Sequence, residues 1–171
     1  MLNKWAEMIA AEVAPEYKPL APMMMTAYLR GGKERKQLFE SASIGGGFLP
    51  DGGVSLLPYG FLALSGIAAP LMQLCSNLGL GTINDLLSCW KTLLEVINTG
   101  KKLKEKGEVV NKGDDTLAAL RRVMDEVQKS LEKQGLTKEQ SELVTYRVMK
   151  TLLQEPNEGA QFIQAFQEGK R

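Results

Sequence analysis

Residues 114–154, DDTLAALRRVMDEVQKSLEKQGLTKEQSELVTYRVMKTLLQ, hold the clearest structural pattern in this chain of 171 residues. Apolar residues recur there in steps of three and four, which is the spacing of an amphipathic helix. In the first half of the stretch these residues are Leu117, Leu120, Met124, Val127 and Leu131. Asp114 or Asp115 can cap the start of this helix, and Gly135 ends it.

A second helix follows within the same stretch. Thr137-Lys138-Glu139-Gln140 has the form of a capping box, in which the first and fourth side chains close the first helical turn. The apolar residues expected on the inner side of this helix are Leu143, Val144, Val148, Met149, Leu152 and Leu153. Because the loop around Gly135 is short, we expect residues 114–154 to form an antiparallel helical hairpin.

Helical spacing also marks both ends of the chain. The first predicted helix carries an apolar stripe and ends before Pro15; the stripe consists of Leu2, Trp5, Ile9 and Val13. A last short helix follows Pro156 and holds Phe162, Ile163 and Phe166. No segment alternates with the period of a strand over a useful length. We therefore predict an all-α fold, a bundle of about five to seven helices.

A second N-terminal helix is expected over residues 20–30, where Gly31-Gly32 stops it. Its predicted inward-facing residues are Leu20, Met23, Met24, Ala27 and Tyr28. Three methionines follow one another here, Met23 to Met25, and consecutive helical residues point about 100° apart. At least one of the three is therefore expected to be exposed or to contact a partner.

The middle of the chain differs in composition from both ends. Residues 44–81 are apolar and rich in glycine and proline. The 33 residues of 52–84 hold no charge, although about eight charged residues would be expected at the chain's overall fraction of 24%. We expect four residues to break any helix here: Pro58, Gly60, Gly66 and Pro70.

The chain is interpreted as one helical unit over residues 1–171. In this interpretation, helices of 1–43 precede the apolar segment 44–81, and an amphipathic helix over 82–106 follows it. A linker is expected over 107–113. The hairpin and the last short helix complete the unit over 114–171.

Three interpretations of the apolar segment remain open. It can be the buried centre of the bundle, a membrane-inserting element or a protein-facing surface. Residues 54–75 are long enough to cross ~30 Å of hydrocarbon, but the expected breaks favour a re-entrant hairpin, or insertion after oligomerisation, over a simple span. The residues predicted to contact a membrane or a second subunit are Phe48, Val54, Leu57, Tyr59, Phe61, Leu62, Leu64, Ile67, Leu71 and Trp90.

Basic residues flank the apolar segment on both sides. They are predicted to bind lipid headgroups or another anionic partner, with ordinary solvated surface as the alternative. These residues are Arg30, Lys33, Arg35, Lys36, Lys101, Lys102 and Lys104. The net charge is only +1, from 21 Lys and Arg against 20 Asp and Glu, so no nucleic-acid partner is expected.

The absence of histidine limits the chemistry open to this chain. It excludes Ser-His-Asp and Cys-His catalysis and histidine-ligated zinc. We expect no enzymatic activity, no cofactor and no metal. Cys75 and Cys89 lie in apolar surroundings and are expected to be reduced thiols. Because Glu7 and Glu12 interrupt the first apolar pattern, no secretory signal is expected, and the predicted location is the cytoplasm or the cytoplasmic face of a membrane.

Two functions are compatible with these features. The first is a non-enzymatic helical protein that acts by self-assembly, by membrane insertion of its apolar segment, or by both. Its expected partners are further copies of the chain and a lipid bilayer. The alternative is a soluble helical adaptor or regulatory protein that binds a protein partner through the 114–154 hairpin.

Overall fold

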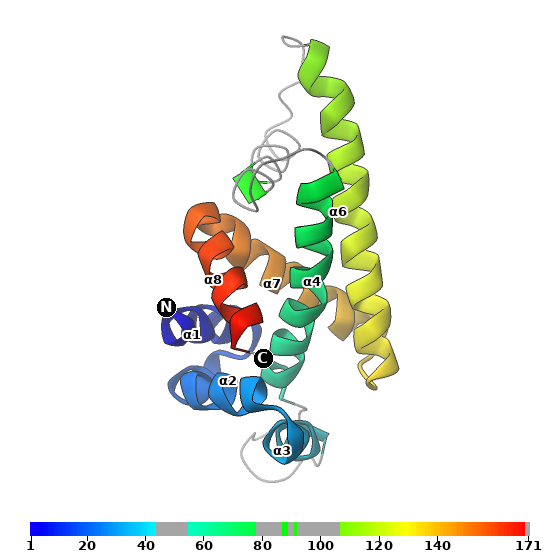
Figure 1. Cartoon of the computed structure of the whole chain (residues 1–171). Coiled ribbons are helices and arrows are strands. Elements are labelled where there is room, and N and C mark those ends of the chain that lie inside the picture. The colour runs from blue at the N-terminus through cyan, green and yellow to red at the C-terminus, as the bar shows by residue number, and fades with distance from the viewer. Residues whose placement is uncertain (44–54, 78–86, 89–90, 92–106, 170–171) are drawn as a thin grey trace.

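The computed structural model describes residues 1–43, 55–77, 87–88, 91 and 107–169 (Figure 1). In order, its elements are α1 (Leu2–Val13), the 3-10 helix η1 (Pro15–Leu20), α2 (Ala21–Arg30), α3 (Gly32–Ser43), α4 (Leu57–Asn77), α6 (Gly107–Lys133), α7 (Lys138–Gln154) and α8 (Pro156–Glu168). These described residues form seven α-helices and no strand. The predicted all-α bundle of five to seven helices is confirmed.

Helix α4 is the centre of the bundle. It contacts six other helices, and in Figure 1 it runs alongside α6. Five of its apolar side chains, spread over about four turns, are fully buried: Leu57, Phe61, Leu64, Ile67 and Leu71. A helix that meets neighbours on nearly every side has no solvated face that needs charged residues. This position explains the missing charges for the part of 52–84 that the structure describes.

The predicted breaks within α4 are wrong, because the helix is continuous from residue 57 to 77. Pro58 lies in the first turn, where backbone N–H groups have no partner within the helix. Gly66 allows close packing, because a Cβ atom on it would lie only 3.2 Å from Val127 Cγ2. A Cβ atom on Gly60 would make an ordinary contact, at 3.4 Å from Ile9 Cγ2. Pro70 lies inside the helix without ending it.

The predicted hairpin is present, and its capping box forms as expected (Figure 1). The Gln140 backbone N–H donates to Thr137 Oγ1 at 3.2 Å, and the Thr137 N–H donates to Gln140 Oε1 at 3.0 Å. Gly135 adopts a φ of 98°. This backbone conformation ends a helix, and glycine adopts it with little strain because it has no Cβ atom.

The linker predicted over 107–113 is wrong, since α6 already begins at Gly107. Gly113 therefore lies inside the helix. One internal glycine costs about 1 kcal/mol relative to alanine, which is too little to stop a helix of 27 residues that packs against α4 and α7.

The two ends of the chain pack together through α1 and α8. The Trp5 ring stacks on the Phe162 ring with centroids 4.9 Å apart and planes 5° from parallel. Outside this contact, the Lys4 ammonium group forms ion pairs with Glu155, at 3.1 Å, and with Glu158. The predicted stripe of the first helix is confirmed, with Trp5, Ile9 and Val13 buried.

Candidate functional site

Most of the predicted membrane or subunit contacts on α4 lie in the interior of this fold. Six of them are buried: Leu57, Tyr59, Phe61, Leu64, Ile67 and Leu71. Leu62 is half-buried. Phe48, Val54 and Trp90 lie outside the described residues. None of the described helices combines the length and apolar character needed to cross a bilayer.

The basic residues of the N-terminal part do not form one cationic patch. Arg30 pairs with Glu34 at 3.4 Å, and Lys36 pairs with Glu40 at 3.5 Å. Lys33 is exposed. The cluster therefore carries both signs of charge at its surface. The second predicted cluster, Lys101, Lys102 and Lys104, lies outside the described residues.

Arg35 packs against another side chain of the bundle, so its guanidinium group is not free to bind an anionic partner. Its guanidinium carbon lies 4.1 Å from the centre of the Tyr28 ring, and its Nη2 donates to Tyr28 Oη at 2.6 Å. Tyr28 Oη also lies 2.8 Å from Ser65 Oγ on α4. Burial raises the pKa of the Tyr28 hydroxyl, so this group stays protonated over the physiological range. Together these contacts join α2, α3 and α4.

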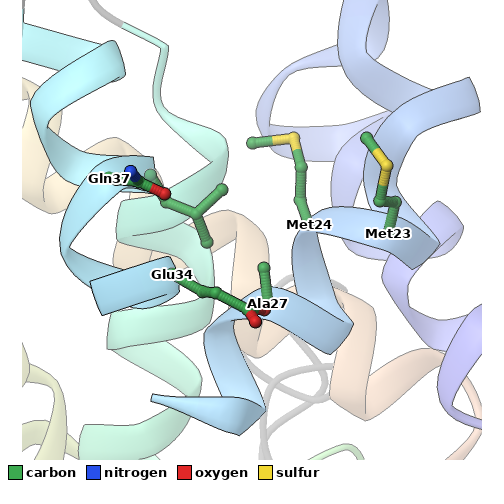
Figure 2. A pocket seen from close by; sticks show the side chains of 6 residues that line it. Met23, Met24, Ala27, Glu34 and Gln37 are labelled. Carbon is green, nitrogen blue, oxygen red and sulfur yellow. The ribbon is translucent and has the colours of Figure 1, made fainter. Parts of the chain in front are cut away.

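A groove of about 240 Å³ lies between α2 and α3 (Figure 2). Its α2 wall consists of Met23, Met24 and Ala27, and its α3 wall consists of Glu34, Gln37 and Leu38. Gly31 and Gly32, with φ values of 73° and 53°, make the turn that sets α3 against α2. The groove is thus apolar along α2 and has polar groups on its α3 side.

The groove exists because α2 carries two apolar stripes. Its core-facing stripe consists of Ala21, Met25 and Tyr28, all of them buried. The other stripe begins at Leu20, the N-cap residue just before α2, and continues with Met23, Met24 and Ala27, at spacings of three and four residues. Leu20 and Met23 are exposed, with 65% of the Met23 surface open to solvent, and Met24 and Ala27 are half-buried.

These exposures correct one prediction and confirm another. The expectation that Leu20 and Met23 face inward is wrong, because both stripes have helical spacing and the spacing alone does not tell which one meets the core. The expectation that one of three consecutive methionines is exposed is confirmed by Met23. The prediction rested on the run of three methionines; the second apolar stripe of the same helix is a further sequence signal of a contact surface, which the prediction did not use.

A second apolar surface feature lies on α7. Leu143 is 39% exposed and Tyr146 is 59% exposed, one helical turn apart. The prediction that Leu143 faces inward is wrong. The buried side of α7 instead includes Ser141 and Thr145, which lie two residues before and two residues after Leu143. Their small side chains let neighbouring helices pack close to this side of α7.

The chain matches no family model, no curated protein and no solved structure. Its function is therefore argued from the geometry above. Among the described residues, no three Cys, Asp or Glu side chains gather in an arrangement that could hold a metal ion. The groove between α2 and α3 is a surface hollow formed entirely by described residues.

Proposed function

We propose that this chain is a non-enzymatic helical protein that acts by self-assembly, and that copies contact each other through the surface around the α2–α3 groove. We call this surface the assembly face and define it by Leu20, Met23, Met24, Ala27 and Leu38. The observation that carries the proposal is the second apolar stripe of α2, which the fold leaves open on one side. An apolar stripe of this kind on a surface helix is typical of a contact surface.

The shape of the assembly face favours a second copy as its partner. Leu20 and Met23 are exposed, and Met23 also forms part of the wall of the hollow that Met24, Ala27 and Leu38 line. In a two-fold contact the same patch meets itself, so a patch that holds both a protrusion and a hollow can be complementary to its own copy. Methionine side chains adapt easily to such contacts because they are unbranched and flexible.

The charges around the assembly face also fit a like partner. At the α3 wall of the groove, Glu34 pairs with Arg30 at 3.4 Å, and the neighbouring Lys33 is exposed. A surface with both signs of charge can meet its own copy without net repulsion. A surface of one sign would instead favour a partner of the opposite charge.

Membrane insertion or subunit contact through α4 is a separate proposal that has less support. It requires α4 to leave six neighbouring helices and to bring buried side chains such as Phe61 and Leu64 to the outside. Contact through the assembly face requires no opening of the bundle.

Sedimentation equilibrium over a wide range of protein concentration tests the proposal. We expect wild type to form a dimer, and Met23→Lys to weaken the dimer by about tenfold or more, which corresponds to roughly 1.4 kcal/mol. Tyr146→Lys is the matched control, because it introduces the same charge at an exposed apolar residue outside the assembly face. A wild type that stays monomeric, or a Met23→Lys variant that dimerises as wild type does, would contradict the proposal. Flotation of wild type with vesicles of phosphatidylcholine and phosphatidylserine would instead support insertion of α4.

The exposed pair on α7 favours a second candidate function, that of an adaptor whose C-terminal hairpin binds a protein partner. Leu143 and Tyr146 lie one turn apart and are open to solvent. If this function holds, a protein captured by wild type is lost with Tyr146→Lys and retained with Met23→Lys, at unchanged melting temperature. Retention by both variants would contradict it.

A further inference from the structure

The three consecutive methionines of α2 differ sharply in their access to solvent. Met23 is 65% exposed, Met24 is half-buried in the groove, and Met25 is 1% exposed. Among the methionines that the structure describes, only Met1 and Met23 are exposed. The assembly face therefore has an accessible thioether at its edge and a second, partly accessible one inside the groove (Figure 2).

We propose that Met23 and Met24 form a redox modification site, at which oxidants of the peroxide class convert the apolar assembly face into a polar one and separate the copies. The oxidation itself follows from the exposure of the two side chains. Its effect on assembly rests on the proposed function. The modification is reversible, because methionine sulfoxide reductases return the sulfoxide to the thioether.

The chemistry needs only the thioether and the peroxide. A sulfur lone pair attacks one oxygen of hydrogen peroxide, the S–O bond forms and the O–O bond breaks. The sulfur loses two electrons and becomes a sulfoxide. The second oxygen takes up the proton from the first and leaves as water. No residue of the protein is consumed apart from the methionine.

The order of oxidation follows from access to the sulfur atoms. Met23 is expected to react first and Met24 second, because the walls of the groove shield Met24. Met25 packs in the core beside Tyr28 and is expected to stay reduced while the fold is intact. A flexible apolar side chain becomes polar and chiral on oxidation, which is known to disrupt methionine-rich contacts.

Assembly and oxidation are expected to oppose each other. In a dimer built on the assembly face the Met23 sulfur is covered, so peroxide reaches it only in separated copies. The rate of Met23 oxidation should therefore fall as the protein concentration rises. Met1 is exposed and lies outside the assembly face, so its rate should stay constant and provide an internal reference.

The test treats the full chain with hydrogen peroxide and locates each sulfoxide by peptide fragmentation in a mass spectrometer. We expect Met23 to be oxidised before Met24 and Met24 well before Met25. Oxidation of Met25 as fast as Met23 would overturn the modification site. The test is run at a dilution at which the copies are separate, where the order of oxidation depends only on the fold of a single copy. It therefore stands even if the untreated protein proves to be a monomer, which would contradict the proposed function alone.

Sedimentation of the oxidised protein tests the effect on assembly. A sulfoxide placed in the contact without a hydrogen-bond partner is expected to weaken the dimer by about tenfold or more, and sulfoxide reductase should restore it. The control is the double variant Met23→Leu and Met24→Leu, which keeps apolar side chains of similar size but removes the sulfur atoms. The dissociation constant of this variant is measured before treatment, and peroxide should leave that constant unchanged, although the Met1 of the variant is still oxidised. A wild type that dimerises unchanged after full oxidation of Met23 and Met24 would overturn the redox control.

Discussion

Gly159 lies where the backbone of α8 approaches the backbone of α7 closely. A Cβ atom on Gly159 in α8 would lie 2.8 Å from the Leu152 carbonyl oxygen of α7, with Leu87 and Trp5 atoms at 3.5 Å on either side. A backbone oxygen cannot rotate away as a side chain can. We expect Gly159→Ala to lower the free energy of unfolding by about 1–3 kcal/mol, measured by urea denaturation.

Gly60→Ala is the matched control for this prediction. Its nearest neighbour would be Ile9 Cγ2 at 3.4 Å, which is an ordinary contact with a side chain. Alanine also favours a helix over glycine by up to about 1 kcal/mol. The stability of Gly60→Ala should therefore equal or exceed that of wild type. Equal losses in the two variants would show that the close approach to Leu152 is not the cause.

We expect Lys4 and Glu158 to give the stability of the folded molecule a pH dependence. Their hydrogen bond lowers the pKa of Glu158 below its ordinary value of 4.5 and raises the pKa of Lys4 above its ordinary value of 10.5. A carboxyl whose pKa is lowered by folding stabilises the folded state fully at any pH above its ordinary pKa. This stabilisation is lost as the pH falls through the lowered pKa. For Lys4 the stabilisation of the folded state is complete at any pH below the ordinary pKa of lysine. It is lost as the pH rises through the raised pKa.

The prediction concerns the difference between wild type and Lys4→Met. We expect wild type to be more stable at about pH 7, and the difference to shrink as the pH falls below the ordinary pKa of a glutamate. Melting temperatures of both proteins, measured from about pH 7 to about pH 3, check this. A difference that stays the same over this range would mean that Lys4 acts through packing of its carbon chain.

The contribution of the α7 capping box to the free energy of unfolding can be measured by one substitution. Thr137→Ala removes the hydroxyl that accepts from the Gln140 N–H. We expect a loss of about 1 kcal/mol in the free energy of unfolding, measured by urea denaturation. Thr137→Ser keeps the hydroxyl and should lie close to wild type. A serine variant as unstable as the alanine variant would point to the lost methyl group instead of the cap.

The starts and ends of helices, such as the start of α7, were predictable because the residues that define them are neighbours in the sequence. The capping box needs only Thr137 and Gln140, and Gly135 ends α6 by its own backbone conformation. The continuity of α4 was not predictable in this way. Gly60 and Gly66 resemble helix breakers until their contacts with Ile9 and Val127 are known. Those contacts join residues far apart in the sequence.

The candidate site was predictable only in part, for the same reason. Three consecutive methionines had to leave at least one exposed, and Met23 is that residue. Which of the two apolar stripes of α2 faces outward depends on the helices that cover the other one. The position of Arg35 depends on the ring of Tyr28 and on Ser65 behind it. A run of basic residues carries no information about such a neighbour.

At the scale of the whole molecule, α4 couples the N-terminal helices to the C-terminal ones. It contacts α1 and α2 as well as α6, α7 and α8. Because Leu64 is fully buried in α4, its truncation leaves a cavity inside the bundle. We expect Leu64→Ala to lower the free energy of unfolding by about 2–5 kcal/mol in urea denaturation. Leu62→Ala, at a half-buried position of the same helix, should cost less.

Hydrogen exchange distinguishes a bundle whose helices unfold together from one whose helices open separately. If α4 holds the bundle together as one unit, Leu64→Ala should lower amide protection in α1 and in α7 by the same free energy, although neither helix carries the substitution. Loss of protection in α4 alone would mean that this helix opens without its neighbours. Such local opening would also lower the barrier that now separates the buried α4 side chains from a membrane. The same measurement thus decides how much of the bundle must open before α4 can be exposed.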